Sequence, residues 1–210
     1  TDLAKAVLED KLGYNIIFKE IDWNQRYLEL EAGTIDCIWN GFTANTADPD
    51  GVMRSEKVDF SYNYMENRQV IIAKADAGIA TAADLDGLTA AAESGSAGES
   101  YAKGLKLGTK GCVKQTDCLL EVNAGSCEVA VLDAQLAKSY CGKGDYSDLE
   151  IVENMSSDVE YYAIGFKKGS ELTAKVNEQL EKLAADGTIA KLAKQYGVEN
   201  TAITDFSNQK

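Results

Sequence analysis

Apolar runs in the first part of the chain predict a sheet covered by helices. The runs at 16–21 and 35–42 are almost continuously apolar, which is typical of strands buried on both faces. Each run follows apolar residues at helical spacing, and a glycine ends each predicted helix. The strands that this pattern predicts lie at 16–21, 35–42, 58–61 and 69–74, and the helices lie at 3–12 and 27–30. Alternation of helix and strand predicts a parallel sheet in a first unit that closes near Lys74.

A second unit of the same kind follows the segment 75–80. This segment has few large side chains, so we expect it to cross between two lobes. The elements predicted after it are strands at 88–93, 127–132 and 149–152 and helices at 100–105, 118–124 and 134–141. The chain then continues with a predicted strand at 161–166 and two amphipathic helices separated by Gly187.

Composition excludes several classes of function. The chain has 34 acidic and 21 basic residues and a formal net charge of -13, so it repels nucleic acids and anionic membrane surfaces. Its apolar runs are far shorter than the ~20 residues of a membrane-spanning helix. The chain contains no histidine and no CxxC pair. The sequence therefore predicts no catalytic residue, no metal site and no cofactor.

The five cysteines cannot all pair with one another. Packing in the core is one interpretation, because a free cysteine behaves as a small apolar residue. A local bridge between Cys112 and Cys118, or between Cys127 and Cys141, is the other. No chemistry is assigned to them on either interpretation.

Three places carry the residue types that bind a free amino acid, which needs donors for its carboxylate and an acid for its ammonium group. Arg54 lies in the loop after a predicted strand, where α/β sheets bind ligands, although a solvated loop arginine is the alternative. The turn from Ser94 to Glu99 either directs N–H groups at an anion or serves only as a helix cap. Asp133 follows a buried run and either holds an ammonium group or caps the next helix.

Taken in order, these pieces resemble the polar amino-acid solute-binding proteins of bacterial ABC importers. The resemblance extends from Thr1 to about Val198. The motifs that carry it are TDLAKAV, IDCIWNGFT, an arginine shortly before VDFS, SGSAGES, AGSCEVAVLDA, EYYAIGFKKGSEL and LAADGTIAKLAKQYG. Each motif is weak alone, but their order and spacing are specific.

The resemblance implies a periplasmic-binding-protein-like fold of type II. In this fold two α/β lobes are joined by a two-strand hinge, and the ligand lies in the interlobe cleft, which closes by hinge bending. The C-terminal helices return to the first lobe. The first lobe is then expected to comprise 1–74 and 163–210, and the second lobe 75–162.

The same resemblance implies a set of ligand-binding residues. Arg54 is expected to bind the ligand carboxylate together with Gly41 and Thr43, and Asp133 is expected to bind the ammonium group. In the second lobe, Ser96 and Ala97 add carboxylate contacts. Asn40, Ser94, Trp39 and Phe42 complete the predicted site. Aromatic residues beside strands often pack in the core, so core packing is the alternative for the last two.

The sequence departs from the family in three respects. The family has two further strands before the helix that begins at Thr1, so we expect either a truncated chain or a partner chain that fills the gap. Extra residues at 44–53 are expected to shift Arg54. Ala97 stands where a hydroxyl residue is common, which removes one hydrogen bond with the ligand.

The function expected from this resemblance is an extracytoplasmic receptor that delivers a free, polar amino acid to the membrane permease of an ABC importer. The alternatives are a ligand-sensing domain of a membrane receptor and a dehydratase-type enzyme on the same fold, which needs a general acid or base. The implied location is the periplasm or, with a lipid anchor after removal of a signal peptide, the outer face of a Gram-positive cell membrane. A monomer is expected, and a dimer formed by strand exchange is the alternative if the opening strands are absent.

Overall fold

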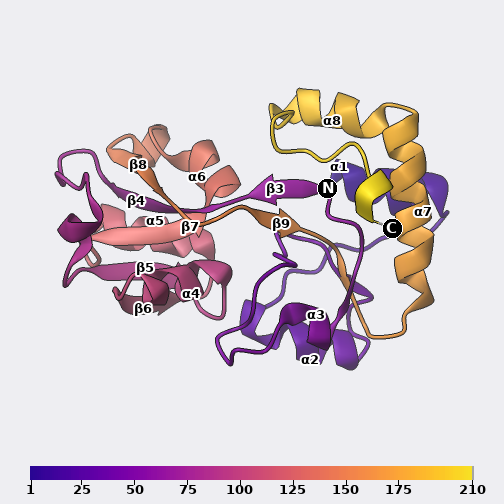
Figure 1. The fold of residues 1–210 in the computed structure, drawn as a ribbon, viewed down its shortest axis with the longest axis horizontal. Helices are drawn as coiled ribbons and strands as arrows, with labels where there is room; N and C mark the ends of the chain where they lie inside the picture. Colours follow the sequence, from indigo (N-terminus) through magenta and orange to yellow (C-terminus); the bar gives the residue numbers. More distant parts are fainter. Residues whose placement is uncertain (210) are drawn as a thin grey trace.

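Two lobes joined by a pair of strands make up the computed structural model, which describes residues 1–209 (Figure 1). The joining strands are β3 (Met65–Asn67) and β9 (Glu160–Tyr162), which pair antiparallel. β3 leads into the second lobe and β9 returns from it, so the chain crosses between the lobes twice. The N-terminal and C-terminal helices lie together in the first lobe (Figure 1).

A five-stranded sheet forms the centre of the second lobe, in the order β6-β5-β7-β4-β8. Its strands are β4 (Gln69–Lys74), β5 (Thr89–Glu93), β6 (Gly108–Cys112), β7 (Val129–Asp133) and β8 (Leu149–Ser156). β5 is parallel to β6 and β7, whereas β4 is antiparallel to β7 and β8. The predicted parallel arrangement is confirmed for β5 and β7.

Helices cover both faces of this sheet. The helices of the lobe are η3 (Ala82–Leu85), α4 (Ala97–Gly104), α5 (Gln115–Asn123), α6 (Ala134–Tyr140) and η4 (Gly144–Tyr146). Successive side chains of a strand point to opposite faces. On β4, Ile72 packs in the same cluster as Leu119 of α5, whereas Ile71 packs in the cluster that contains Ala102 of α4. The continuous apolar run of β4 therefore reflects burial on both sides, as its pattern predicts.

The first lobe is built around a smaller sheet in the order β1-β10-β2. Its strands are β1 (Cys37–Ile38), β2 (Asp59–Phe60) and β10 (Gly165–Phe166). Its helices are α1 (Asp2–Lys5), η1 (Ala6–Lys11), η2 (Trp23–Gln25), α2 (Arg26–Glu31), α3 (Arg54–Lys57), α7 (Glu171–Ala185), α8 (Thr188–Tyr196) and η5 (Ser207–Gln209). Leu180 of α7 packs with Val7 of η1 and Phe166 of β10 in the core of this lobe. No helix within residues 1–209 is long and apolar enough to cross a membrane.

The segment 16–21 differs most from the sequence prediction, because it forms no strand. Its side chains are exposed instead of buried, with Ile17 85% and Phe18 59% exposed. An apolar run becomes a buried strand only when neighbouring elements pair with it and cover it. Within residues 1–209, β1 pairs with β10 alone, so no strand of this sheet pairs with the segment.

The predicted parallel sheet of the first lobe is also wrong. β10 lies between β1 and β2 and pairs antiparallel with both. It reaches this position by the return crossing from the second lobe rather than through a helix that connects neighbouring strands. A distant segment of the chain therefore sets the direction of pairing, and local patterns carry no information about it.

The first crossing lies earlier in the chain than Lys74, where the prediction placed it. β4 pairs with β7 along Gln69 to Ala73, so it belongs to the second lobe, and so does the segment 75–80. The predicted strand at 161–166 is divided between β9 and β10. β6 was not predicted, because its sequence GTKGC is polar and rich in glycine.

The cysteines bear out the core-packing interpretation in part. All five are free thiols, and Cys112, Cys118 and Cys127 are buried. Burial raises the pKa of the Cys118 thiol, and the neighbouring Cys112 raises it further. Neither of the two local bridges is formed.

Candidate functional site

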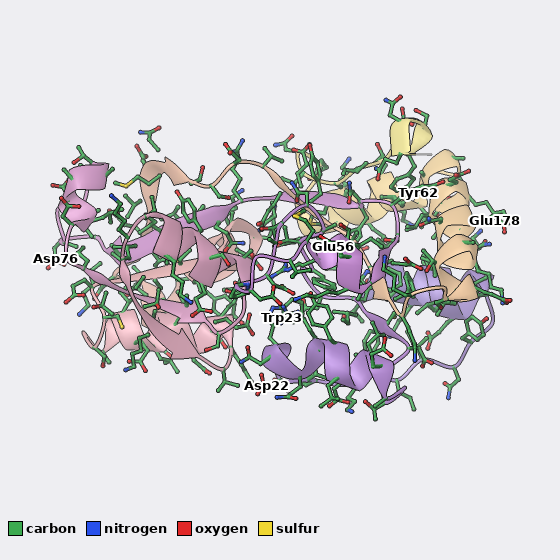
Figure 2. The ribbon with its side chains drawn as sticks, turned by 60° about the horizontal axis from the view of Figure 1, so that its bottom comes forward. Asp22, Trp23, Glu56, Tyr62, Asp76 and Glu178 are labelled. Carbon is green, nitrogen blue, oxygen red and sulfur yellow. The ribbon has the colours of Figure 1, made fainter. Side chains whose placement is uncertain are left out.

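A cavity of about 1000 Å³ lies between the lobes and is lined by residues of both. Figure 2 shows Asp22 and Trp23 on the side of the first lobe that faces the second, whereas Asp76 and Glu178 mark opposite ends of the molecule. Both Asp22 and Trp23 line the cavity. A cavity of this size accommodates a small ligand together with water.

Arg54 lines the cavity from the first lobe, where it begins α3. Its side chain is 1% exposed. Its Nε donates to Asp48 Oδ1 at 2.8 Å, and its Nη1 donates to the carbonyl oxygen of Thr43 at 3.1 Å. Its Nη2 is buried and has no hydrogen-bond partner. A buried donor without a partner is unusual, and an anionic ligand in the cavity would satisfy it.

The loop 44–53 contains Asp48, which holds the side chain of Arg54 in place. Besides Arg54, this buried carboxylate accepts hydrogen bonds from Arg26 Nη2 at 2.6 Å, Tyr27 Oη at 2.6 Å and Lys57 Nζ at 2.9 Å. Burial alone raises the pKa of Asp48, but its hydrogen bonds and the charge of Arg26 outweigh burial and hold the pKa well below its usual range. We call these residues the Asp48 cluster: Arg26, Tyr27, Asp48, Arg54 and Lys57.

The turn after β5 meets the cavity from the second lobe. Ser96 is the N-cap of α4, and its Oγ accepts from the backbone N–H of Glu99 at 3.0 Å. Ser96 and Ala97 both line the cavity. The first N–H groups of a helix have no partner within it and favour an anion. The helix-cap interpretation is confirmed, and anion binding at this turn stays a prediction.

Asp133 ends β7, and its buried carboxylate is surrounded by side-chain donors. Its Oδ1 accepts from Gln69 Nε2 at 2.6 Å and Asn67 Nδ2 at 3.1 Å. Its Oδ2 accepts from Gln115 Nε2 at 2.6 Å. Burial raises its pKa, and the hydrogen bonds from Gln115, Gln69, Tyr162 and Asn67 oppose that rise only in part.

Glu160, on the return crossing, shares the amide donors of Asp133. Its Oε1 accepts from Asn67 Nδ2 at 2.5 Å and Gln69 Nε2 at 2.6 Å. Burial raises its pKa, and the charge of Asp133 raises it further. Two neighbouring carboxyl groups are therefore held together by amides rather than by a cation.

Glu93 brings a third carboxyl group into contact with these amides. It ends β5, lines the cavity and is hydrogen-bonded by Gln115, which also holds Asp133. Burial raises the pKa of Glu93 to about 7, and the charge of Asp133 contributes to that rise. We call this group the carboxyl–amide network: Glu93, Asp133, Glu160, Asn67, Gln69 and Gln115. Among the described residues, no lysine or arginine forms an ion pair with its carboxyl groups.

The lobes touch one another beside the cavity. Lys114 of the second lobe forms an ion pair with Glu20 of the first at 2.5 Å. Gly95, whose φ is +73°, lies so close to Asn24 that an added Cβ would be 2.6 Å from Asn24 Oδ1. A Cβ on Gly41 would be 3.4 Å from Asp133 Oδ2. The two lobes are therefore in contact along one edge of the cavity.

Most of the residues predicted from the sequence lie around this cavity. Those that line it are Trp39, Asn40, Gly41, Thr43, Arg54, Ser96, Ala97 and Asp133. Phe42 does not, because it is fully buried in the core of the first lobe against Trp23 and Phe60. Ser94 does not line it either, since its side chain lies against Gly111 of β6 and its N–H donates to the carbonyl of Cys112.

Sequence reasoning missed Glu93 and Gln115. Glu93 lies at the carboxyl end of a predicted strand, as Asp133 does, so the same argument would have found it. Gln115 had no comparable signal, because it follows the unpredicted strand β6. Among residues 1–209, no group of three or more His, Cys, Asp or Glu side chains is arranged to hold a metal ion.

The chain is similar in sequence to proteins that are named for the amino acid they bind. The chain is 29% identical over 199 residues to the "Arginine-binding extracellular protein ArtP" of Bacillus subtilis (strain 168), which covers 93% of this chain and 75% of that protein. It is 26% identical over 204 residues to the "L-cystine-binding protein TcyA" of the same organism, with 96% and 71% covered.

The fold is that of the type II periplasmic binding proteins, as predicted. A solved structure described as the "substrate binding protein of an amino acid ABC transporter" superposes with a TM-score of 0.83 at 30% identity, covering 93% of this chain and 85% of that chain. The family described as "Bacterial extracellular solute-binding proteins, family 3" matches residues 1–199. The chain therefore belongs to this family of extracellular solute-binding proteins.

Proposed function

We propose that this chain binds a free amino acid in the cavity between its lobes and delivers it to the membrane permease of an ABC importer. One observation carries the proposal: the buried Nη2 of Arg54 lacks a partner, and Arg54 lines a cavity that Asp133 also lines. An amino acid carries one carboxylate and one ammonium group on the same carbon atom. It therefore matches an unpaired donor and an acid that line one cavity.

The ligand carboxylate is bound by Arg54 from the first lobe and by the N-terminus of α4 from the second, where Ser96 and Ala97 lie. Thr43, whose carbonyl oxygen accepts from Arg54, and Gly41 line the same cavity. The ammonium group is bound by Asp133. Binding in this way joins the lobes through the ligand, so occupancy favours the closed form that the permease recognises.

The relatives support an amino acid as the ligand. The names of ArtP and TcyA give arginine and cystine as the ligands of those proteins. These two amino acids share the α-carboxylate and α-ammonium groups but differ in their side chains. A common main-chain site with a variable side-chain pocket accounts for both.

The family gives the chain an extracytoplasmic location. We place it in the periplasm or, tethered by a lipid, on the outer face of a Gram-positive cell membrane. The two relatives from Bacillus subtilis support the second location. Labelling of intact cells with a membrane-impermeant reagent, before and after removal of any outer membrane, distinguishes the two.

Binding without catalysis is part of the proposal. The dehydratase alternative needs a general acid or base near neutral pH, and Glu93, with a pKa of about 7, is the described carboxyl group that meets this requirement. The relatives and the family are nevertheless named for binding. Recovery of the bound amino acid unchanged, measured by mass spectrometry after prolonged incubation, supports a receptor, whereas conversion of the amino acid contradicts it.

A calorimetric titration with amino acids tests the binding site itself. We expect Arg54→Ala to weaken binding by about 10- to 100-fold, since hydrogen bonds to charged groups contribute ~1.5–3 kcal/mol and 1.4 kcal/mol is tenfold. Arg54→Lys keeps the charge but loses the planar fork, so it also binds weakly. Arg68→Ala is the matched control, because Arg68 is exposed and outside the cavity. Unchanged affinity in a folded Arg54→Ala variant would contradict the assignment.

A further inference from the structure

Glu93 lines the cavity and forms no ion pair among the described residues. It is partly buried at the end of β5, and its hydrogen-bond partner is the neutral amide of Gln115. Among the described residues, no lysine or arginine lies within ion-pair distance of it. An acid in such a place either binds a proton or binds a cation from outside the chain.

The amides that surround Glu93 connect acids and supply no charge. Gln115 bonds to both Glu93 and Asp133, while Gln69 and Asn67 bond to both Asp133 and Glu160. Amide donors satisfy carboxylate lone pairs, yet they leave the negative charge of the group uncompensated. The carboxyl–amide network is therefore a region of negative potential at the wall of the cavity.

The basic side chains that line the cavity are committed to other acids. Lys19 pairs with Glu29 at 2.6 Å, and Lys114 pairs with Glu20 at 2.5 Å. Arg54 pairs with Asp48, which leaves its Nη2 as the one nitrogen of its guanidinium group without a partner. None of these cations is available to Glu93.

The charged residues that line the cavity indicate which charged groups the ligand carries. Arg54 compensates the carboxylate of an amino acid, and Asp133 compensates its ammonium group. Glu93 is the other carboxyl group of the network that lines the cavity, so a ligand with a neutral side chain leaves it without a cation. A ligand with a second cationic group compensates it. On the basis of the proposed function, we infer that Glu93 is the specificity-determining residue of this site and selects a cationic amino acid such as lysine, ornithine or arginine.

Titration of Glu93 is consistent with this role. Its pKa of about 7 results from burial first and the charge of Asp133 second, and the hydrogen bond from Gln115 opposes both. The other charged or titratable groups that act on it are Arg26, which lowers its pKa, Asp117, which raises it, and the thiol of Cys118. A bound cation lowers this raised pKa, so Glu93 loses its proton when the ligand binds.

Isothermal titration of the refolded, ligand-free protein at pH 7 tests the inference. The matched ligands are arginine and citrulline, which have nearly the same shape but differ in side-chain charge. We expect arginine to bind at least about tenfold tighter than citrulline, and Glu93→Gln to remove this preference. Glu150→Gln is the control, because Glu150 is exposed on β8 and outside the cavity.

Proton release gives a second measurement that a merely structural role of Glu93 would not affect. Titration in buffers of different ionisation enthalpy reports the protons exchanged on binding. With a pKa of about 7, Glu93 is half protonated at pH 7. Arginine binding is therefore expected to release roughly half a proton from the unmodified protein and none from Glu93→Gln.

The outcomes separate the inference from the proposed function. Equal affinity for arginine and citrulline, with no change in Glu93→Gln, overturns the role of Glu93 but leaves amino-acid binding intact. Failure of every amino acid to bind, in a protein that unfolds cooperatively, overturns the proposed function itself. Glu93→Gln is nearly isosteric, and its melting temperature confirms that it folds.

Discussion

Two charged groups of residues flank the same cavity and are built in opposite ways. In the Asp48 cluster, a single carboxylate accepts hydrogen bonds from three cationic side chains and a tyrosine. In the carboxyl–amide network, three carboxyl groups share amide donors and have no cation among the described residues. The pKa of Asp48 falls below its usual range, whereas the pKa values of Glu93, Asp133 and Glu160 rise.

The comparison shows that the two groups of residues carry opposite excess charge. The Asp48 cluster holds three cationic side chains around one carboxylate, so it fixes Arg54 in place and keeps positive charge for the ligand carboxylate. The carboxyl–amide network is not compensated, and charge from outside the protein is required to complete it. One side of the cavity is therefore a scaffold, and the other side sets the charge of the ligand.

Replacing Asp48, the central acid of the Asp48 cluster, is expected to have the largest effect on the stability of the protein. Asp48→Asn leaves Arg26 and Arg54 buried without a full counter-charge, so we expect the free energy of unfolding to fall by about 3–5 kcal/mol. Urea denaturation measures the change. Asp50→Asn is the control, because Asp50 is exposed and pairs with Lys57 alone, and it is expected to leave stability nearly unchanged. Equal effects of the two substitutions would show that the cluster is not a scaffold.

Closure of the lobes offers a smaller and more selective test. Gly95→Ala places a Cβ 2.6 Å from Asn24 Oδ1, so the asparagine side chain must turn away before the lobes close. Gly87→Ala is matched in backbone, since both glycines have positive φ, but nothing lies within 4 Å of its Cβ. Both variants are expected to lose about 1 kcal/mol of stability from backbone strain, and only Gly95→Ala is expected to lose affinity, by about 3- to 10-fold. The same affinity in both variants would show that the contact forms no part of ligand binding.

The smallest expected effect is a change in the stability of the protein with pH, caused by Glu93. Because the pKa of Glu93 in the folded protein is about 7 and its ordinary value is 4.5, this group favours folding most below pH 4.5. That contribution is lost as the pH rises through 7. Relative to Glu93→Gln, the ligand-free protein is therefore expected to lose stability between pH 5 and pH 8, by about 1 kcal/mol after solvent screening. Thermal unfolding at a series of pH values measures it, and a constant difference between the two proteins would mean that Glu93 does not titrate in this range.

The sequence predicted the second lobe better than the first. The second lobe contains apolar runs and amphipathic segments that act locally, so β4, β5, β7 and the helices between them were found near their observed positions. The first lobe depends on β10, which returns from the second lobe and pairs with β1 and β2. The run at 16–21 has the composition of a buried strand, yet it is exposed because burial depends on partners that composition does not specify.

The candidate site was predictable where residues follow strands. Arg54, Ser96 and Asp133 were found because α/β proteins bind ligands at the carboxyl ends of strands. Phe42 was misplaced, because its sequence position does not reveal that it points into the core of the first lobe. The role of Asp48 was not predictable, since the loop that contains it reads as polar and the four side chains that converge on it come from two helices, α2 and α3.

A crystal structure of the protein with arginine at pH 8 tests the central claim most directly. The account predicts the ligand carboxylate within hydrogen-bond distance of Arg54 Nη2 and the N-terminus of α4, the ammonium group at Asp133 and the guanidinium group within 4 Å of Glu93. A ligand bound with its carboxylate away from Arg54, or with its guanidinium group directed away from Glu93, would contradict the account.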